Sequence, residues 1–281
     1  MNFISNKNLE YLNLVEREYL NKTFKRFNGF PKLQQIWTLM DEIWLKLGCN
    51  QYKMHDKNIS LFYQHPVWIL NGFFIEQDPE SINNIKKFSN FIQNQNPKRI
   101  LDFGGGFGNL ARLLGTSLPG SQIEIFDPHP SKIAIFLASS VKNVKFVNEF
   151  SGLYDFIIAT DVFEHLDDPI NSAINSTKYL NHDGQYLMAN CFEPVILCHL
   201  PKLFHFNYSW NFVMQELGFK LGKEVAHGRV FHKVKGFDEI NARKIEKFSS
   251  MIYPIIKKIP RGMNIIGSLL TKIYYNFFIK K

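Results

Sequence analysis

The order of apolar and polar residues divides the chain into a helical first third and an alternating remainder. Apolar side chains recur at helical spacing over residues 9–20 and 33–47, and Gly48 stands where a helix C-cap is expected. Residues 61–76 are rich in aromatic side chains, and His65-Pro66 should interrupt regular structure there. A further short helix is predicted over residues 81–91. We therefore expect a helical cap over residues 1–96, followed by a different fold.

From Arg99 onward, short apolar runs alternate with helical stretches, which favours a parallel α/β sheet. The pattern predicts strands over 99–103, 122–126, 144–147, 155–160 and 184–190. It predicts helices over 107–117, 131–139, 169–180 and 207–217. Two more apolar segments, at 218–221 and 229–234, predict a closing hairpin. We expect this domain to span residues 97–236.

The first predicted strand leads into a loop in which Asp102 is followed by Gly104, Gly105, Gly106 and Gly108. Glycine has no Cβ, so a ligand can approach the backbone closely, and the helix behind the loop offers free N–H groups. The dinucleotide spacing Gly-x-Gly-x-x-Gly would need a glycine at Asn109. The loop therefore predicts a nucleotide-like ligand without deciding which one.

Two later strand ends carry acidic residues. Asp127 follows the second predicted strand, where an acid accepts hydrogen bonds from ribose hydroxyls. The fourth strand ends at Thr160-Asp161 and is followed by Glu164-His165 and a proline-opened helix. Ligands of open α/β sheets lie beyond such strand ends, so these residues are candidates for a binding site.

The Asp102–Gly108 loop, Asp127 and the segment Asp161–His165 together resemble the motifs of class I S-adenosylmethionine-dependent methyltransferases, especially those of ubiquinone biosynthesis, over about residues 98–236. The resemblance implies a Rossmann-like α/β fold with a seven-stranded, mostly parallel sheet whose last strand is antiparallel. The helical cap and a C-terminal helical tail would flank this domain. S-adenosyl-L-methionine is the implied cofactor. The implied cofactor-binding residues are Asp102, Gly104, Gly106, Gly108, Phe126, Asp127, Asn148, Glu149, Thr160 and Asp161.

Methyl transfer to an oxygen requires a group that takes the acceptor's proton. His165 is the first candidate base, although a histidine that caps the helix or binds backbone is an equal alternative. His205 is the second catalytic candidate. Substrate contacts are expected from Tyr63, His65, Trp68, His199 and Tyr208.

Asp161, Glu164 and His165 resemble the Glu-x-x-Glu-His metal-ligand set of ubiquinone-pathway O-methyltransferases and small-RNA 3′-terminal methyltransferases. Aspartate replaces the first glutamate here. The shorter side chain reduces the reach of the set. We therefore expect no metal, with these three residues as the minority alternative.

The positive charge of the chain is concentrated near its end. The net charge is +8, and residues 236–281 hold nine Lys/Arg against three Asp/Glu. Residues 261–281 also carry an apolar stripe, so we expect residues 237–281 to form a basic amphipathic helical tail. Packing on the domain or on a second subunit, as in a homodimer, is the first interpretation of the tail. Peripheral contact with a membrane is the second.

Three scattered cysteines without a Cys-x-x-Cys pair argue against a disulfide scaffold or a structural zinc site. The residues Met1–Lys7 show no signal-peptide pattern, and the sequence has no long apolar stretch. Together with the scattered cysteines, these features predict a cytoplasmic protein. The expected activity is O-methylation of a small-molecule or sugar hydroxyl. Two alternatives stay open: metal-assisted 3′-terminal methylation of RNA, and a non-catalytic cofactor-binding protein. A nucleic-acid partner is not expected.

Overall fold

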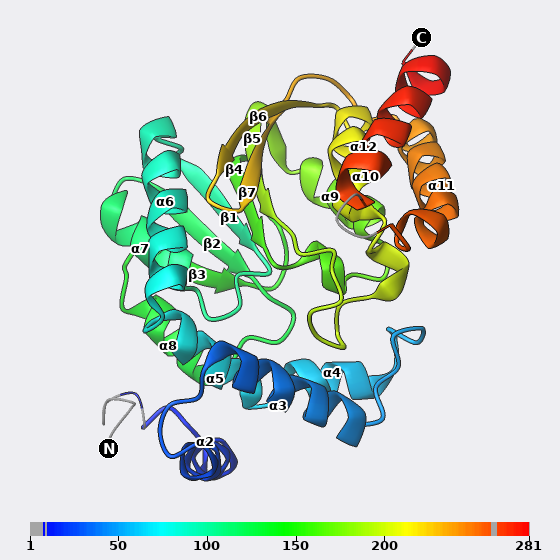
Figure 1. Ribbon diagram of the computed structural model, residues 1–281. Helices are drawn as coiled ribbons and strands as arrows, with labels where there is room; N and C mark the ends of the chain where they lie inside the picture. The colour runs from blue at the N-terminus through cyan, green and yellow to red at the C-terminus, as the bar shows by residue number, and fades with distance from the viewer. Residues whose placement is uncertain (1–7, 9, 260–262, 281) are drawn as a thin grey trace. The chain divides into compact units, whose positions relative to one another are not determined.

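A single seven-stranded sheet runs through the chain in the order β3-β2-β1-β4-β5-β7-β6 (Figure 1). The computed structural model describes residue 8, residues 10–259 and residues 263–280. Its residues group into two compact units. The first comprises Met1–Phe150 with Ile196–Cys198, and the second comprises Ser151–Val195 with His199–Lys281. Each unit is described separately below.

The first unit contains three parallel strands and the helices that precede and connect them. The strands are β1 (Arg99–Phe103), β2 (Gln122–Phe126) and β3 (Val144–Val147), with Leu101 opposite Glu124. Their connecting helices, α7 (Asn109–Ser117) and α8 (Lys132–Ser139), pack on β2 and β3. The preceding helices are α2 (Leu14–Arg26), α3 (Leu33–Lys46), α4 (Lys57–Tyr63), α5 (Val67–Ile75) and α6 (Pro79–Gln95).

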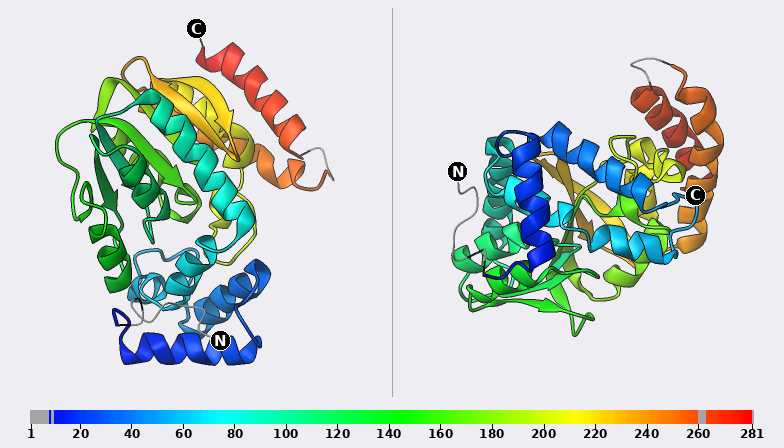
Figure 2. Two further views of the ribbon diagram at one scale, coloured as in Figure 1. Left: turned by 90° about the vertical axis from the view of Figure 1, so that its left-hand side faces the viewer. Right: turned by 90° about the horizontal axis from the view of Figure 1, so that it is seen from below.

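The second unit contains the remaining strands and the C-terminal helices. Strand β4 (Tyr154–Thr160) pairs in parallel with β5 (Leu180–Ala189), while β7 (Gly228–Lys233) is antiparallel to both β5 and β6 (Phe219–Val225). The helices α11 and α12 pack on α10 and on each other (Figure 2). The helical elements are η1 (Phe163–His165), α9 (Pro169–Thr177), η2 (Pro201–Leu203), α10 (Phe206–Glu216), α11 (Glu239–Ile256), α12 (Met263–Tyr274) and η3 (Tyr275–Ile279).

The predicted fold class is confirmed, including the antiparallel last strand β7. Strand β5 begins four residues before the expected start, at Leu180. The side chain of Leu180 lies where Gly184 leaves space, so the chain remains extended through the glycine. Helix α6 is longer than expected because Asp78 caps its first turn and accepts from Ser81 N at 2.8 Å.

We propose that the chain divides into segments 1–96, 97–236 and 237–281, of which Met1–Lys7 and Arg261 lie outside the described residues. Helices α11 and α12 divide the predicted tail between them. Within residues 10–259 and 263–280, none of the helices has the length and apolar character that a membrane crossing requires.

Candidate active site

The glycine loop between β1 and α7 keeps its backbone in conformations that favour glycine. Gly104, Gly106 and Gly108 have φ angles of +72°, +52° and +73°. Gly104 N donates to Phe126 O at 2.7 Å, which ties the loop to the end of β2. Helix α7 starts after Gly108, and within the described residues no side chain caps its first turn. Its first N–H groups therefore point from a helix N-terminus toward the loop, as anion- and nucleotide-binding loops require.

Two acidic side chains flank this loop. Asp127 Oδ2 accepts from Gly106 N at 3.0 Å, and its Oδ1 accepts from His129 N at 2.8 Å. Asp102 is buried, and burial, with a smaller contribution from the charge of Asp127, raises its pKa to about 7. A Cβ added at Gly105 would lie 2.6 Å from Asp102 Oδ2, so the glycine is needed to seat that carboxyl group.

Aromatic rings lie next to the loop in the same unit. Phe126 stacks on Phe103 at 5.8 Å and contacts Phe150 edge-on at 4.8 Å. Asn148 and Glu149 are exposed and follow β3, whose carboxyl end lies at the same edge of the sheet as that of β2. The first unit thus brings the predicted residues from three strand ends to one edge.

Tyr63 brings the aromatic segment of the helical cap into contact with this edge. Tyr63 stacks on His129 with ring centroids 6.2 Å apart, next to Asp127. His65 and Trp68 are half-buried, and Trp68 Nε1 donates to Phe62 O at 3.0 Å. Burial lowers the pKa of His65 to about 4, so this side chain is neutral near pH 7.

A contact that the sequence did not signal joins the glycine loop to α5. The ring of Phe107 occupies the space where a Cβ on Gly72 would lie, 2.3 Å from Phe107 Cγ. Asn109 Nδ2 donates to Gly72 O at 3.3 Å, and Arg112 binds Glu76 at 2.5 Å. Asn109, which stands where the dinucleotide spacing would need a glycine, therefore helps to hold helix α5 against the loop.

In the second unit, a cluster of three polar side chains follows β4. One ligand-type atom from each of Glu164, His165 and His199 lies within 4.8 Å of the others. Glu164 is fully buried, its Oε1 accepts from Cys191 N at 2.8 Å, and Oε2 has no hydrogen-bond partner among the described residues. Burial, and then the charge of Asp161, raises the pKa of Glu164 to about 8.

The two histidines of this cluster face each other. Their ring centroids are 4.9 Å apart and the rings are nearly perpendicular. His199 Nδ1 donates to Glu193 O at 2.7 Å, so Nε2 of the neutral ring carries no proton. Of the expected set of Asp161, Glu164 and His165, the cluster holds Glu164 and His165, and its third member is His199 instead of Asp161. Thr160 ends β4, and Asp161 adopts a left-handed φ of +54° with its N–H bonded to Ala189 O.

His205 and Tyr208 lie elsewhere in the second unit. His205 Nδ1 is 2.7 Å from Ser249 Oγ, and the hydroxyl of Tyr208 donates to Ser249 O at 2.6 Å. Both residues are buried, and their polar atoms are used in the contact between α10 and α11. Burial lowers the pKa of His205 to about 4. These bonds favour a packing role for both residues.

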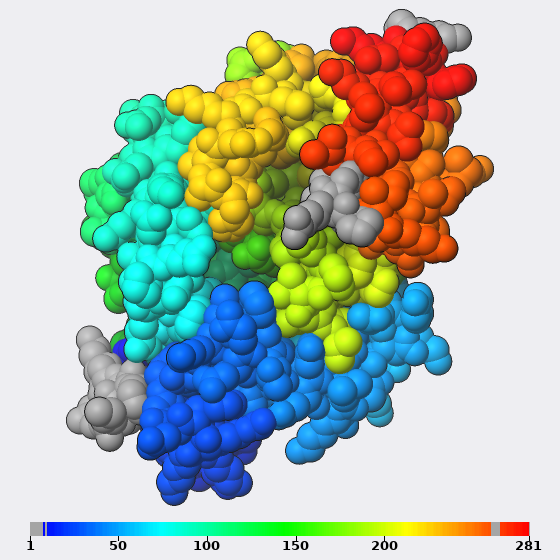
Figure 3. Space-filling model, in the orientation of Figure 1, coloured from blue at the N-terminus to red at the C-terminus, as the bar shows by residue number. Residues whose placement is uncertain are grey.

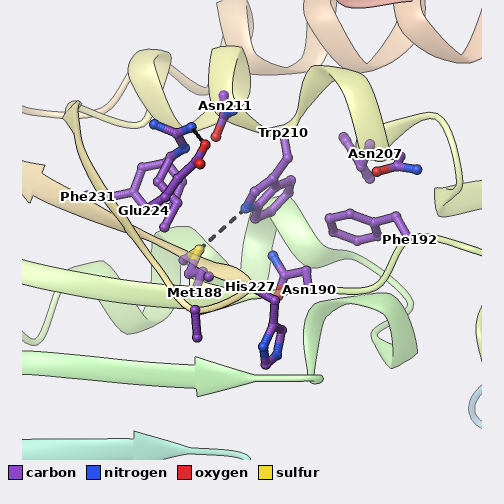
Figure 4. Close-up of a pocket in the computed structure, with 13 residues that line it drawn as sticks. Met188, Asn190, Phe192, Asn207, Trp210, Asn211, Glu224, His227 and Phe231 are labelled. Atoms are coloured by element: carbon purple, nitrogen blue, oxygen red, sulfur yellow. Dashed lines mark hydrogen bonds and ion pairs between the residues drawn. The ribbon is translucent and has the colours of Figure 1, made fainter. Parts of the chain in front are cut away.

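A cavity of about 360 Å³ lies between the end of β5, helix α10 and the β6–β7 hairpin (Figure 4). Phe192, Phe206 and Trp210 line it, with ring centroids 5.1–5.5 Å apart. Trp210 Nε1 donates to Met188 Sδ at 3.4 Å. One side of the cavity is therefore a rigid aromatic surface.

Polar groups complete the lining of the cavity. Asn190, Asn207 and Asn211 contribute amides, and Asn190 Oδ1 is buried without a hydrogen-bond partner in the described part of the chain. Glu224 and Arg229 also line the cavity and form an ion pair with each other. The lining thus has little net charge and an acceptor atom suited to a ligand's N–H or O–H group.

A family model described as a methyltransferase domain matches residues 76–220, which is more than half of the chain. The chain belongs to this methyltransferase family. It carries an S-adenosylmethionine-dependent methyltransferase domain, and its cofactor is S-adenosyl-L-methionine. No curated protein sequence matches the chain significantly.

The chain is similar to solved methyltransferase structures at low sequence identity. An O-methyltransferase family protein from Burkholderia thailandensis is 10% identical, with a TM-score of 0.51 over 72% of this chain and 71% of that one. A candidate O-methyltransferase from Nostoc punctiforme PCC 73102 is 15% identical, with a TM-score of 0.47 over 60% of this chain. The match spans 61% of the Nostoc protein's own length. The N-methyltransferase NodS from Bradyrhizobium japonicum WM9, in complex with S-adenosyl-L-homocysteine, is 12% identical, with a TM-score of 0.42 over 57% of this chain and 91% of NodS.

The glycine loop of the first unit fits this cofactor. At Gly106 the nearest atom to an added Cβ is Gly104 O, 4.0 Å away, so among the described residues the backbone borders open space. Asp127 keeps further lone pairs on both oxygens for ribose hydroxyls, although each already accepts one N–H. The loop would therefore hold the cofactor through its backbone, and Asp127 would hold the sugar.

Proposed function

We propose that the protein is an O-methyltransferase that acts on a hydroxyl group of a small molecule or sugar, with His165 as the proton acceptor. The observation that carries the proposal is the Glu164–His165–His199 cluster at the end of β4, in the same unit as the cavity of Figure 4. Ligands of open α/β sheets bind at these strand ends.

The protein's own side chains need to supply only part of the catalysis. When bound, S-adenosyl-L-methionine supplies a methyl group on a positively charged sulfur, so little further activation is needed. The chain must hold the acceptor oxygen in line with that group and remove its proton. The location of His165 in η1 and its contact with the ring of His199 support this role.

The cavity supports a small neutral acceptor over an RNA end. Its volume of about 360 Å³ is at the lower end of the range of ligand pockets. Its aromatic residues suit the face of a phenolic or sugar ring. Because the guanidinium of Arg229 is already paired with Glu224, the cavity offers little attraction for phosphate groups.

A second candidate is metal-assisted transfer. It is favoured by Oε2 of buried Glu164, which has no hydrogen-bond partner among the described residues. Glu164, His165 and His199 would hold a divalent cation such as Mg²⁺ or Mn²⁺. The backbone bond of His199 Nδ1 is the kind of second contact that orients a metal ligand. Such an ion would lower the pKa of an acceptor hydroxyl.

The first experiment measures transfer of a radiolabelled methyl group to phenol, catechol and methyl glycosides by His165→Gln. We expect kcat to fall roughly 10²- to 10⁴-fold, with unchanged cofactor affinity in calorimetry. His182→Gln is the matched control, because His182 is 85% exposed. Full activity of His165→Gln would refute the assigned base. Tight cofactor binding without turnover of any acceptor would instead favour the non-catalytic alternative.

A separate experiment tests the metal. Electron paramagnetic resonance would follow the binding of Mn²⁺ to the wild type, to Glu164→Gln and to the exposed control Glu80→Gln. Loss of binding in Glu164→Gln alone, with activity abolished by EDTA and restored by Mn²⁺, would support the metal-assisted route. Activity that resists EDTA, with no Mn²⁺ bound, would leave His165 as the base.

A cytoplasmic location also belongs to the proposal. Within the described residues Cys49, Cys191 and Cys198 form no disulfide, as is usual in a reducing compartment. Localisation of a tagged full-length chain would test it.

A further inference from the structure

Part of the apolar stripe of helix α12 is exposed. Its large side chains at three successive turns are between 45% and 74% exposed: Ile265, Leu269 and Ile273. Phe277 and Phe278, in the following η3 turn, are 71% and 67% exposed. We call these five residues the tail face. Figure 3 shows α11 and α12, in orange to red, at the molecular surface.

The opposite side of α12 makes the packing contacts. Gly267 lies against the ring of Tyr208, where an added Cβ would come within 2.6 Å of Cδ1. Thr271 is buried, and the hydroxyl of Tyr275 donates to Glu216 Oε1 at 2.8 Å. The predicted apolar stripe is therefore divided: Tyr274 stacks on Phe248 of α11, whereas Ile265, Leu269 and Ile273 stay exposed. The small Gly267 allows the close approach on the packed side.

Positive charge accompanies this exposed face. Residues 247–281 contain seven Lys/Arg and no Asp or Glu. Lys257, Lys258, Lys272 and Lys280 are exposed. Helix α11 exposes apolar side chains too, with Met251 and Ile255 at 65% and 70%. A helix surface that joins exposed apolar side chains to lysines without acids has the composition of an interfacial membrane helix.

We propose that the tail face docks the protein on the surface of an anionic lipid bilayer. Apolar side chains would enter the interface, and the lysines would contact the headgroups. A second copy is a poorer occupant, because a two-fold interface would bring two identical acid-free, cationic segments together. The proposal is independent of the methyl acceptor.

The test is flotation of the full-length protein with vesicles of phosphatidylcholine containing 30% phosphatidylglycerol (about a third anionic lipid, to give a strongly negative surface). We expect binding to these vesicles and little binding to pure phosphatidylcholine. Ile273→Ser/Phe277→Ser should lower the partition coefficient at least about tenfold, because two exposed apolar groups are lost. Lys257→Glu/Lys258→Glu should lower it by about tenfold or more.

Two matched controls separate the tail face from general effects. Leu14→Ser/Val15→Ser removes two exposed apolar residues from α2, and Lys86→Glu/Lys87→Glu reverses two exposed charges on α6. Both should bind like the wild type. Equal binding by the tail variants would overturn the proposal. So would a wild-type dimer in sedimentation that Ile273→Ser/Phe277→Ser dissociates while vesicle binding is absent, because a second copy would then cover the face. Salt-sensitive retention of RNA without vesicle binding would also overturn it.

Discussion

Replacing Gly106 with alanine would separate cofactor binding from folding in the glycine loop. Among the described residues, an added Cβ meets no atom nearer than Gly104 O at 4.0 Å, so the substitution causes no overpacking. The φ of +52° costs a residue with a side chain about 1–2 kcal/mol. This cost is small against a typical stability of about 5–15 kcal/mol. We therefore expect a folded variant with a slightly lowered Tm, by roughly 2–4 °C per kcal/mol.

Binding should suffer far more than folding. If the cofactor lies against the backbone at Gly106, the methyl group would overpack that contact by about 1–3 kcal/mol. That penalty corresponds to affinity about 5- to 150-fold weaker. Titration calorimetry with S-adenosyl-L-methionine measures it directly, and thermal unfolding of the same samples measures stability.

Two other glycines provide the comparison. At Gly120 no atom lies within 4 Å of an added Cβ, so Gly120→Ala should change neither binding nor stability. At Gly105 the added Cβ would lie 2.6 Å from Asp102 Oδ2 and 2.8 Å from Ile125 Cγ2, both of them buried, so Gly105→Ala should destabilise the fold by about 1–3 kcal/mol. A folded Gly106→Ala that binds the cofactor with wild-type affinity would refute the assignment of this loop.

Two predictions concern stability. The free energy of unfolding should fall as pH drops from 6.5 toward 4, because burial holds the pKa of folded His205 at about 4 while the unfolded chain takes up a proton near 6.5. In urea titrations, His205→Gln should lose up to about 3 kcal/mol less unfolding free energy than the wild type between pH 6.5 and pH 4. An equal loss in both proteins would count against the explanation. Arg243→Met should cost roughly 1–2 kcal/mol, since Arg243 binds Asp168, the N-cap residue of α9, at 2.6 Å. Arg26→Met, which breaks an exposed pair with Glu42, should cost under about 0.5 kcal/mol, and equal losses would contradict this reasoning.

The sequence predicted the parts of the fold whose signal is local. Strands β1, β2 and β3 are where apolar runs between turn residues place them, because buried parallel strands need continuous apolar segments. The glycines at 104, 106 and 108 were recognisable because positive φ angles demand that residue type. Asp127 was found by its spacing from the loop. Its bond to Gly106 N gives that spacing a structural reason.

The acceptor side was harder to predict because distant segments build it. His165 lies in η1, whereas His199 follows an irregular segment after β5, and no periodicity connects the two. Each histidine was selected for its chemistry, but their contact comes from the fold alone. The cavity residues Asn190 and Trp210 were not selected at all, since a single amide or indole carries no spacing signal.

The tail shows that an apolar stripe predicts a buried helix face but does not identify the surface that covers this face. The periodicity of Ile265, Leu269 and Ile273 is that of a packed helix, yet the chain packs the other side, where Gly267 lets the Tyr208 ring approach. This outcome also bears on the basic charge of the tail. A surface built for RNA would place its cations in a groove with aromatic rings for stacking, and its binding would vanish as salt rises. Three of the five tail-face residues are aliphatic and offer no stacking face for bases, whereas all five can insert among acyl chains. Binding to anionic vesicles should therefore keep a salt-resistant part that disappears in Ile273→Ser/Phe277→Ser, whereas RNA retention would be lost entirely in salt.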